Sequence, residues 1–347
     1  MRAERRHRSR RFRLLLGILF ACVVLYLLEV GLRIAGVAPA YRSGASGSWR
    51  MTPNLQASSL RGPRDGHDFT VSTNADGLRT KLPKERTPGV TRVAVMGDST
   101  VFGWGVNDGE SVAEGLQAAL DAEVPGQVAG KVEVLNAGQP GYSTTQAAWF
   151  FDEVVKAYTP DRVIVFVPMH DFNKVLVSDR EVLDGGATLA ARTRILLASN
   201  SRAYQLLRQS MWAGTEEPML LPDRPTGEPR VERVSDAERA AAFDAMRATL
   251  AEWGGQLLIG FLPFHADLVG QTGRDGADRV GVPWARAYGK AHDVALVDVR
   301  ACCGPDGGAL VLPDDYGHLA AEGNRRVGAA MAPAVRASLL LSAPEAP

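Results

Sequence analysis

Residues 93–99 read Val-Ala-Val-Met-Gly-Asp-Ser, an apolar run that ends in a glycine, an acid and a serine. The run is typical of a strand buried on both faces of a parallel sheet, so the serine hydroxyl is expected at the carboxyl edge of that sheet. Far downstream, residues 315–318 read Asp-Tyr-Gly-His and place an acid three residues before a histidine. Together the two segments could supply a nucleophile, a base and a carboxylate that orients the base.

Similar apolar runs recur along the chain and alternate with helical patterns. Continuous apolar strands separated by helices predict a parallel sheet that helices cover on both faces. We expect strands over residues 92–96, 131–136, 162–167, 256–262 and 295–299. We expect helices over residues 111–122, 144–158, 235–253, 280–292 and 319–341, with Pro333 as a kink in the last.

One long segment interrupts this alternation between the third and fourth strands. Residues 174–234 contain a helical pattern over 189–212 and a proline-rich loop over 216–234. The helix that follows is opened by Ser235 with Glu238 three residues on, a capping box, and it can serve as the crossover to the fourth strand. In doubly wound folds the site lies at the carboxyl ends of the strands, so this insertion is placed to cover it.

The N-terminus combines a basic cluster with a long apolar run. Residues 1–13 hold seven arginines and one glutamate, and Leu14–Leu32 is a 19-residue stretch whose single charge is Glu29. At about 1.5 Å per residue the stretch spans roughly 28 Å, close to one hydrocarbon core. The arginines favour a cytoplasmic N-terminus by the positive-inside rule. We therefore expect an uncleaved single-pass anchor over residues 14–35, with all that follows outside the cytoplasm.

Two other export signals stay open for this segment. Leu19–Cys22 is a weak match to a lipoprotein cleavage box, and Ser9–Arg11 contains an arginine pair of the twin-arginine type. Beyond the anchor we expect residues 36–90 to form a tether and an irregular extension, residues 91–341 a catalytic domain, and residues 342–347 a tail.

Charge and cysteine content exclude several classes of function. The formal net charge is zero and the basic cluster precedes an apolar run, so we expect no nucleic-acid partner. Cys22 lies in the apolar run, and the adjacent pair Cys302 and Cys303 fits neither a disulfide framework nor a zinc site. We therefore expect no metal and no cofactor.

Further polar segments follow the predicted strands. Residues 136–144, Asn-Ala-Gly-Gln-Pro-Gly-Tyr-Ser-Thr, follow the second strand, and their glycines let backbone amides turn towards a ligand, as an oxyanion hole requires. His170, after the third strand, is a candidate hydrogen-bond donor. Asp98, Asp171 and His265 are candidates for the rim of the site. Each segment also has a structural interpretation, as a turn, a helix cap or a surface histidine.

In this order and spacing, the segments resemble the motif blocks of the SGNH/GDSL hydrolase family. Residues 97–99 match its nucleophile block, Gly141 matches the glycine of its oxyanion-hole block, and residues 315–318 match its Asp-x-x-His block. Residues 168–171 fall where the family has Gly-x-Asn-Asp. The resemblance covers about residues 91–338, and residues 74–79 and 102–106 resemble a membrane-anchored bacterial branch of the family.

The resemblance implies a three-layer, flavodoxin-like α/β/α domain with a central parallel sheet of about five strands. It also implies that Ser99 is the nucleophile, His318 the general base and Asp315 the carboxylate that orients it. The amides of Ser99 and Gly141 would then form the oxyanion hole. His170 stands where the family has asparagine, and we expect it to replace that donor, with its tautomer set by its neighbours.

The leading hypothesis is a membrane-tethered serine esterase in the bacterial cell envelope. It would remove acyl groups, acetyl first among them, from an envelope glycan or a small ester through an acyl-serine intermediate. Two alternatives stay open. One is an O-acyltransferase that passes the acyl group to a sugar hydroxyl with the same three residues, and the other is a non-catalytic glycan-binding protein.

Overall fold

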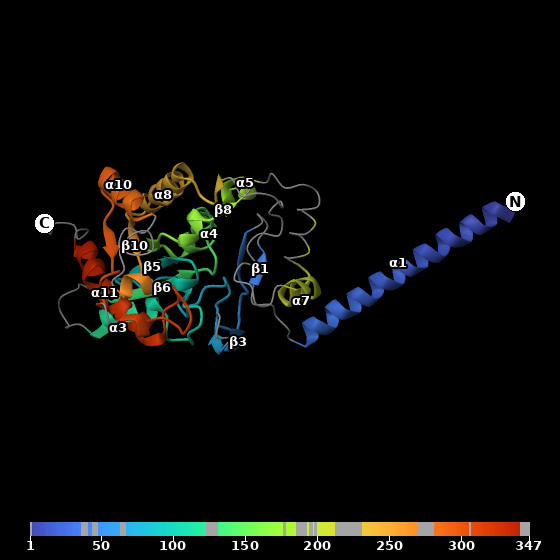
Figure 1. The fold of residues 1–347 in the computed structure, drawn as a ribbon, viewed down its shortest axis with the longest axis horizontal. Coiled ribbons are helices and arrows are strands. Elements are labelled where there is room, and N and C mark those ends of the chain that lie inside the picture. Colours follow the sequence, from blue (N-terminus) through green and yellow to red (C-terminus); the bar gives the residue numbers. More distant parts are fainter. Residues whose placement is uncertain are drawn as a thin grey trace.

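The computed structural model describes most of the chain as an α/β body with one long helix, α1, extending away from it (Figure 1). The described residues are 2–35, 41–43, 48–62, 67–122, 131–175, 178–184, 193, 197, 200–211, 231–269, 281–304 and 307–340.

A five-stranded parallel sheet forms the centre of the body, in the order β11-β10-β7-β5-β6. The chain moves from β5 to β6 on one side and then to β7 on the other. The order therefore reverses at β5, which is where doubly wound folds bind their ligands, and it is the flavodoxin-like order. The five predicted strands are confirmed as β5 Thr91–Gly97, β6 Val132–Gly138, β7 Arg162–Phe166, β10 Gln256–Phe261 and β11 Leu296–Asp298.

Helices cover both faces of this sheet, as predicted. Successive side chains of β5 point to opposite faces of the sheet. Ala94 and Met96 belong to one core cluster, and Val93 and Val95 belong to the other. A strand with two buried faces has no polar side, which is why it reads as an unbroken apolar run. The first cluster includes α4 Thr144–Glu153, α8 Asp236–Ala251 and α10 Val282–His292, and the second includes α3 Val112–Ala122 and α11 Ala321–Leu340.

Helices α3 and α11 cross in close contact. A Cβ added at Gly115 of α3 would lie 2.6 Å from the carbonyl oxygen of Asn324, and one added at Gly328 of α11 would lie 2.4 Å from the amide nitrogen of Leu116. Backbone therefore meets backbone at this crossing, and only glycine fits there. Helix α11 continues through Pro333 to Leu340.

Some short elements were not indicated by the sequence. The predicted helix over residues 144–158 is α4 followed by a 3-10 turn, Val155–Tyr158. A four-residue helix α2, Ser99–Phe102, begins at the expected nucleophile. Another 3-10 turn, Gly307–Leu310, precedes the segment that carries Asp315 and His318.

The extension before the sheet is more regular than expected. It contains two antiparallel pairs, β1 Tyr41–Ser43 with β2 Trp49–Met51, and β3 Ser58–Arg61 with β4 Asp68–Val71. Its apolar side chains lie in the same core cluster as α4, so this segment belongs to the folded body. The buried members are Trp49, Met51, Leu55, Phe69, Val71 and Leu78.

The insertion after the third strand begins and ends as one antiparallel pair, β8 Lys174–Val175 with β9 Val231–Glu232. Between them lie α5 Asp179–Leu183 and α7 Arg202–Met211, the latter within the predicted helix over 189–212. Most of the predicted proline-rich loop over 216–234 lies outside the described residues.

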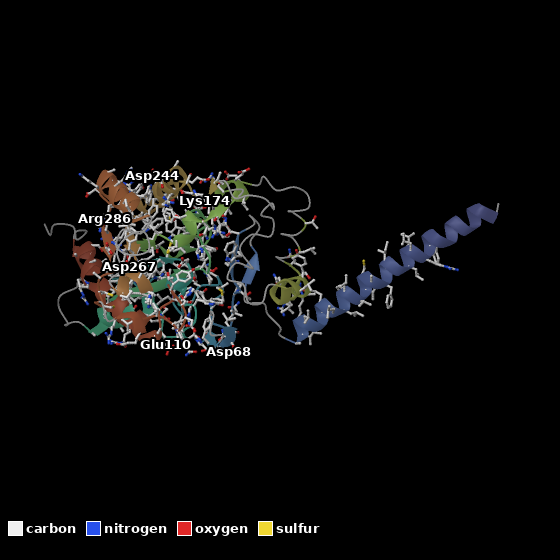
Figure 2. The ribbon with its side chains drawn as sticks, in the orientation of Figure 1. Asp68, Glu110, Lys174, Asp244, Asp267 and Arg286 are labelled. Carbon is white, nitrogen blue, oxygen red and sulfur yellow. The ribbon has the colours of Figure 1, made fainter. Side chains whose placement is uncertain are left out.

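Helix α1, Arg2–Ile34, contains a stretch long and apolar enough to cross a membrane. The stretch is Phe12–Ile34, 23 residues with a mean hydropathy of 2.5. Its side chains stand clear of the body over most of its length (Figure 2). Phe20, for example, is 70% exposed.

Candidate active site

Ser99 lies at the carboxyl end of β5, on a tight strand-to-helix turn. Asp98 is the N-cap of α2, and its carboxylate accepts hydrogen bonds from the amide (2.9 Å) and the hydroxyl (2.7 Å) of Thr100. A Cβ at Gly97 would lie 2.6 Å from Val101 Cγ2, so the turn needs a glycine there. The Gly-Asp-Ser sequence is thus explained locally: a glycine for close packing, an acid to cap the helix, and a serine at its first position.

The structure brings Ser99 together with His318 and Asp315. The hydroxyl oxygen of Ser99 lies 2.8 Å from Nε2 of His318, and Nδ1 of the same ring lies 2.9 Å from Oδ2 of Asp315. A carboxylate only accepts hydrogen bonds, so the proton of the neutral ring stands on Nδ1 and the lone pair on Nε2 faces Ser99. This is the tautomer that a general base for serine requires.

Asp315 is held rigidly behind the histidine. It is buried, and its Oδ1 accepts from the amides of Gly317 (2.8 Å) and His318 (2.9 Å). Burial alone would raise its pKa, but the hydrogen bond and charge of His318 and the two amides outweigh burial and hold the pKa at about 2. Asp315 is therefore a carboxylate at any pH near neutrality, fit to stabilise an imidazolium.

The predicted oxyanion hole of the Ser99 and Gly141 amides stays a prediction, and the structure describes the backbone around both residues. The amide of Ser99 is among the first of α2, which a helix leaves without an internal acceptor. Gly141, in the loop after β6, has φ +74°, a conformation that glycine adopts without strain. The end of β6, which leads to Gly141, lies close to α2, since a Cβ at Gly138 would lie 2.3 Å from the amide nitrogen of Phe102.

His170 lies in a 3-10 turn, Met169–Phe172, directly after β7. Its Nε2 is 3.7 Å from Oδ2 of Asp98, and its side chain is about one quarter exposed at 26%. The ring thus faces the cap of the nucleophile turn. Its expected role as a third oxyanion donor stays a prediction.

Two residues expected at the rim are buried. Asp171 is fully buried, and its carboxylate accepts from the amide (2.8 Å) and hydroxyl (2.7 Å) of Thr144 and from Nε of Arg239 (2.8 Å). Burial raises the pKa of Asp171 against the opposing effect of Arg239 and Thr144. The rim assignment of Asp171 is wrong because a buried guanidinium faces it, and that of Asp98 is wrong because capping holds it inside the turn.

His265 is half-buried and opens the short helix α9, His265–Leu268. Its amide donates to the carbonyl of Tyr316 at 2.8 Å, and the ring of Phe264 packs against Gly317. This segment therefore supports the loop between Asp315 and His318.

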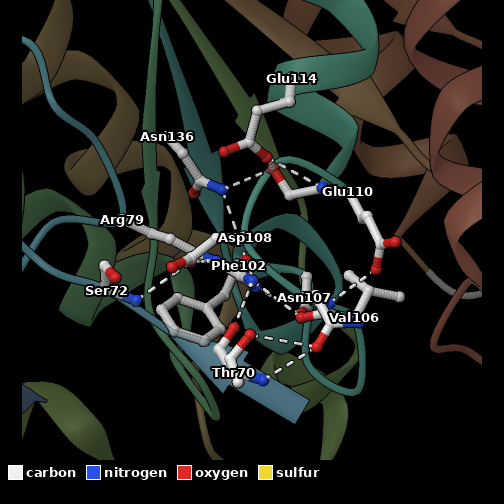
Figure 3. A network of polar contacts seen from close by, with 12 residues as sticks. Thr70, Ser72, Arg79, Phe102, Val106, Asn107, Asp108, Glu110, Glu114 and Asn136 are labelled. Atoms are coloured by element: carbon white, nitrogen blue, oxygen red, sulfur yellow. Dashed lines mark hydrogen bonds and ion pairs between the residues drawn. The ribbon is translucent and has the colours of Figure 1, made fainter. Parts of the chain in front are cut away.

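Sequence patterns did not single out Arg79 as a site residue, yet it organises the loop after α2 (Figure 3). Arg79 is 2% exposed, and its guanidinium donates to the carbonyls of Phe102 (3.1 Å), Gly103 (2.7 Å) and Val106 (2.7 Å). It also contacts Asp108 at 3.3 Å. Burial lowers the pKa of Arg79. The guanidinium thus fixes the backbone that follows the nucleophile.

The loop that carries Gly141 is fastened to the N-terminal extension. Gln139 is fully buried, accepts from the amide of Met51 (2.8 Å) and donates to the carbonyl of Gly77 (3.2 Å). The indole of Trp49 donates to the carbonyl of Pro140 at 3.0 Å, and the hydroxyl of Tyr142 donates to the carbonyl of Trp49. The extension therefore supports the loop that carries Gly141, which is called the oxyanion loop below after its predicted role.

Within the described ranges, no group of three or more His, Cys, Asp or Glu side chains is arranged to hold a metal ion. The described cysteines Cys22, Cys302 and Cys303 are free thiols.

Comparison with protein-family models and with curated proteins gives no match. Solved structures do match. One is a protein assigned to the G-D-S-L family from Desulfitobacterium hafniense (16% identity, TM-score 0.40), covering 70% of this chain and 98% of that one. Another is the acetyl xylan esterase AlAXEase (16%, TM-score 0.41; 70% and 99%). A third is a lipase/acylhydrolase from Enterococcus faecalis (15%, TM-score 0.42; 72% and 96%).

All three are ester-cleaving or G-D-S-L proteins by name. Identities and TM-scores this low do not assign a function, so the function proposed below rests on the geometry of Ser99, His318 and Asp315.

Proposed function

We propose that this chain is a serine esterase that cleaves acyl esters through an acyl-Ser99 intermediate. The observation that carries the proposal is the hydrogen-bonded series from the Ser99 hydroxyl through His318 to Asp315, at the carboxyl edge of the sheet. A protein that only binds a glycan needs no base aimed at a serine hydroxyl. A base with a fixed tautomer and an ionised partner is what serine acylation needs.

In the first half-reaction, Ser99 Oγ attacks the acyl carbonyl while Nε2 of His318 takes the hydroxyl proton. The negative charge that forms on the carbonyl oxygen is stabilised by the amides of Ser99 and Gly141. The intermediate collapses when the bond to the alcohol breaks, and His318 returns its proton to the leaving oxygen.

In the second half-reaction, water attacks the acyl-Ser99 ester. Nε2 of His318 takes a proton from that water, a second oxyanion forms in the same hole, and the carboxylic acid leaves as Ser99 recovers its proton. Asp315 stabilises the imidazolium in both halves without taking the proton.

The proposed setting is the outer side of a membrane. The apolar run Leu14–Leu32 of α1 follows seven arginines, which favours a cytoplasmic N-terminus and a catalytic domain on the other side. A tethered enzyme there meets esters of the cell envelope, so the proposed substrate class is short acyl esters, acetyl first, on an envelope glycan or a small ester.

The test compares hydrolysis of an aryl acetate by the detergent-solubilised full chain and by Ser99→Ala. A matched control is Ser338→Ala, which removes a hydroxyl bonded to the carbonyl of Val335 in α11. We expect Ser99→Ala to lose at least about 10³-fold in kcat and Ser338→Ala to keep the parent kcat. A fluorophosphonate should label the parent at Ser99 and leave Ser99→Ala unlabelled.

Sugar acceptors then separate the two acyl-transfer reactions. An esterase releases acetate at a rate that added sugar leaves unchanged, whereas an acyltransferase forms the acetylated sugar at the expense of acetate. A folded parent that neither hydrolyses the ester nor reacts with the fluorophosphonate contradicts the proposal.

A further inference from the structure

Helix α7 is fastened to the C-terminal end of α1 by one carboxylate. Glu29 of α1 accepts hydrogen bonds from the amides of Arg202 (3.0 Å) and Ala203 (3.1 Å) and from the hydroxyl of Ser201 (3.1 Å). These groups form the start of α7. Glu29 therefore caps a helix from which it is separated by 173 residues of sequence.

Two arginines complete the contact. The guanidinium of Arg33 donates to Glu29 (2.9 Å) and to the carbonyl of Asn200 (2.8 Å). Conversely, the guanidinium of Arg202 on α7 donates a hydrogen bond to the carbonyl of Leu32 on α1 at 3.4 Å. Figure 1 shows α7 at this end of α1, between α1 and the rest of the body.

This contact explains why the apolar stretch contains a charge. A carboxylate near the edge of a hydrocarbon core is costly unless it is paired and hydrogen-bonded. Here Glu29 meets the positive end of a helix, two amides, a hydroxyl and a guanidinium. The first turn of α7 must therefore lie at the same depth as Glu29.

The depth of α7 follows from the place of Glu29 in α1. Glu29 lies five residues before the end of the stretch Phe12–Ile34, which is about 7–8 Å along the helix axis. If α1 spans a bilayer, that position is in the outer part of the hydrocarbon core, about 5 Å from the headgroups. Two leucines of the insertion are exposed, Leu207 in α7 at 57% and Leu197 before it at 40%.

We propose that α7 lies on the lipid surface around the anchor, with Leu207 in the headgroup region and Glu29 as the clamp that keeps it there. The occupant of this surface is the bilayer that holds α1, because no other partner is brought to that depth by the anchor itself. The inference rests on the membrane anchoring proposed above.

The clamp would orient the catalytic domain because the insertion is pinned to the body at both ends. Arg233, beside β9, forms an ion pair with Asp179 at the start of α5 (2.7 Å) and donates to Gln146 of α4 (2.6 Å). Both charged side chains are 1% exposed. Residues on both sides of α7 in the sequence are thus fastened to α4, the helix that follows the oxyanion loop.

The test uses depth-dependent quenching of a fluorophore on single cysteines of the full chain in lipid nanodiscs. Cys22, Cys302 and Cys303 are replaced by serine, and the label is placed in turn at Leu207→Cys, Leu25→Cys and Lys290→Cys. Leu25 lies within the apolar stretch, whereas Lys290 is exposed on α10, on the other side of the body from α1 (Figure 1). The phospholipids carry a quencher either near the headgroup or deep in the acyl chain.

We expect the label at residue 207 to lose fluorescence to the shallow quencher, the label at residue 25 to the deep one, and the label at residue 290 to neither. Adding Glu29→Leu should abolish quenching at residue 207 and leave it unchanged at residue 25. Its hydrolysis of aryl acetate should also stay at the parent rate, because Glu29 is outside the site.

The outcomes separate the two proposals. Quenching at residue 25 without quenching at residue 207 overturns the lipid contact of α7 and leaves the anchor standing. No quenching at either position overturns both. Quenching at residue 207 that survives Glu29→Leu overturns the clamp.

Discussion

Replacing Asp315 with asparagine should remove catalysis while preserving the shape of the site. Oδ1 of Asp315 accepts from the amides of Gly317 and His318, so the amide oxygen of an asparagine must take that place. The NH₂ group then stands where Oδ2 now lies, 2.9 Å from Nδ1 of His318. Because NH₂ donates, Nδ1 must accept, and the ring proton moves to Nε2. Ser99 then faces a donor instead of a base.

The expected loss follows from this tautomer change. Removing the base in this way lowers kcat by about 10⁴-fold, which at about 1.36 kcal/mol per decade corresponds to about 5.4 kcal/mol of activation free energy. KM should stay near the parent value because the change does not touch the ground-state contacts of the ester. The assay is steady-state hydrolysis of an aryl acetate, with thermal unfolding to show that the variant is folded.

A matched control lies one residue away. Asp314 is exposed and has φ +55°, which asparagine tolerates, so Asp314→Asn makes the same chemical change outside the triad. It should keep the parent kcat. A folded Asp315→Asn variant within about tenfold of the parent, a difference of only about 1.4 kcal/mol, would refute the tautomer argument.

Substitutions at three further positions test the surroundings of the triad. Arg79→Met should lower the free energy of unfolding, measured with urea, by about 3 kcal/mol or more, because three buried carbonyls each lose a donor at roughly 1–3 kcal/mol; an unchanged urea midpoint would contradict this. His170→Asn should keep most of the parent kcat, since its amide also donates, whereas His170→Ala should lose about 10²-fold; equal losses in both would assign His170 another role. Gln139→Leu should lower both the melting temperature and kcat with little change in KM, because it frees the oxyanion loop from the extension. Its control is Gln117→Leu on α3, which breaks similar side-chain bonds to the backbone of Val132 and Val134 in β6 and should lower stability alone.

The fold and the relative positions of the three central residues could be predicted because each depends on a local pattern. Residues 93–97 of β5 are apolar at every position because both faces of the strand are buried, and parallel strands bring their carboxyl ends to one edge of the sheet. Ser99 follows the first strand of the sheet and His318 comes after the fifth, so the motif order predicts that the two side chains lie at the same edge. Their catalytic roles stay predictions until the variants are measured.

The residues that hold the loops of the site in place could not be predicted, because they follow no pattern in the sequence. Arg79 and Gln139 act by bonding backbone groups of distant segments, and such bonds follow no period along the chain. The sequence placed Asp171 after the third strand, at the edge of the sheet, but it did not show which way the side chain points. Its burial depends on Arg239, which is 68 residues away. The short strands β1–β4 escaped prediction because three or four residues are too few to show alternation.

The close crossing of α3 and α11 ties the chemistry to the order in which the chain is synthesised. His318 lies three residues before α11, which packs on α3, so the base reaches Ser99 only as α11 docks. At roughly 5–20 residues per second, the 219 residues from Ser99 to His318 take about 10 to 45 seconds to synthesise. During that interval the emerging chain holds a serine with no base, and it gains the ability to attack an ester only after His318 and α11 have been synthesised.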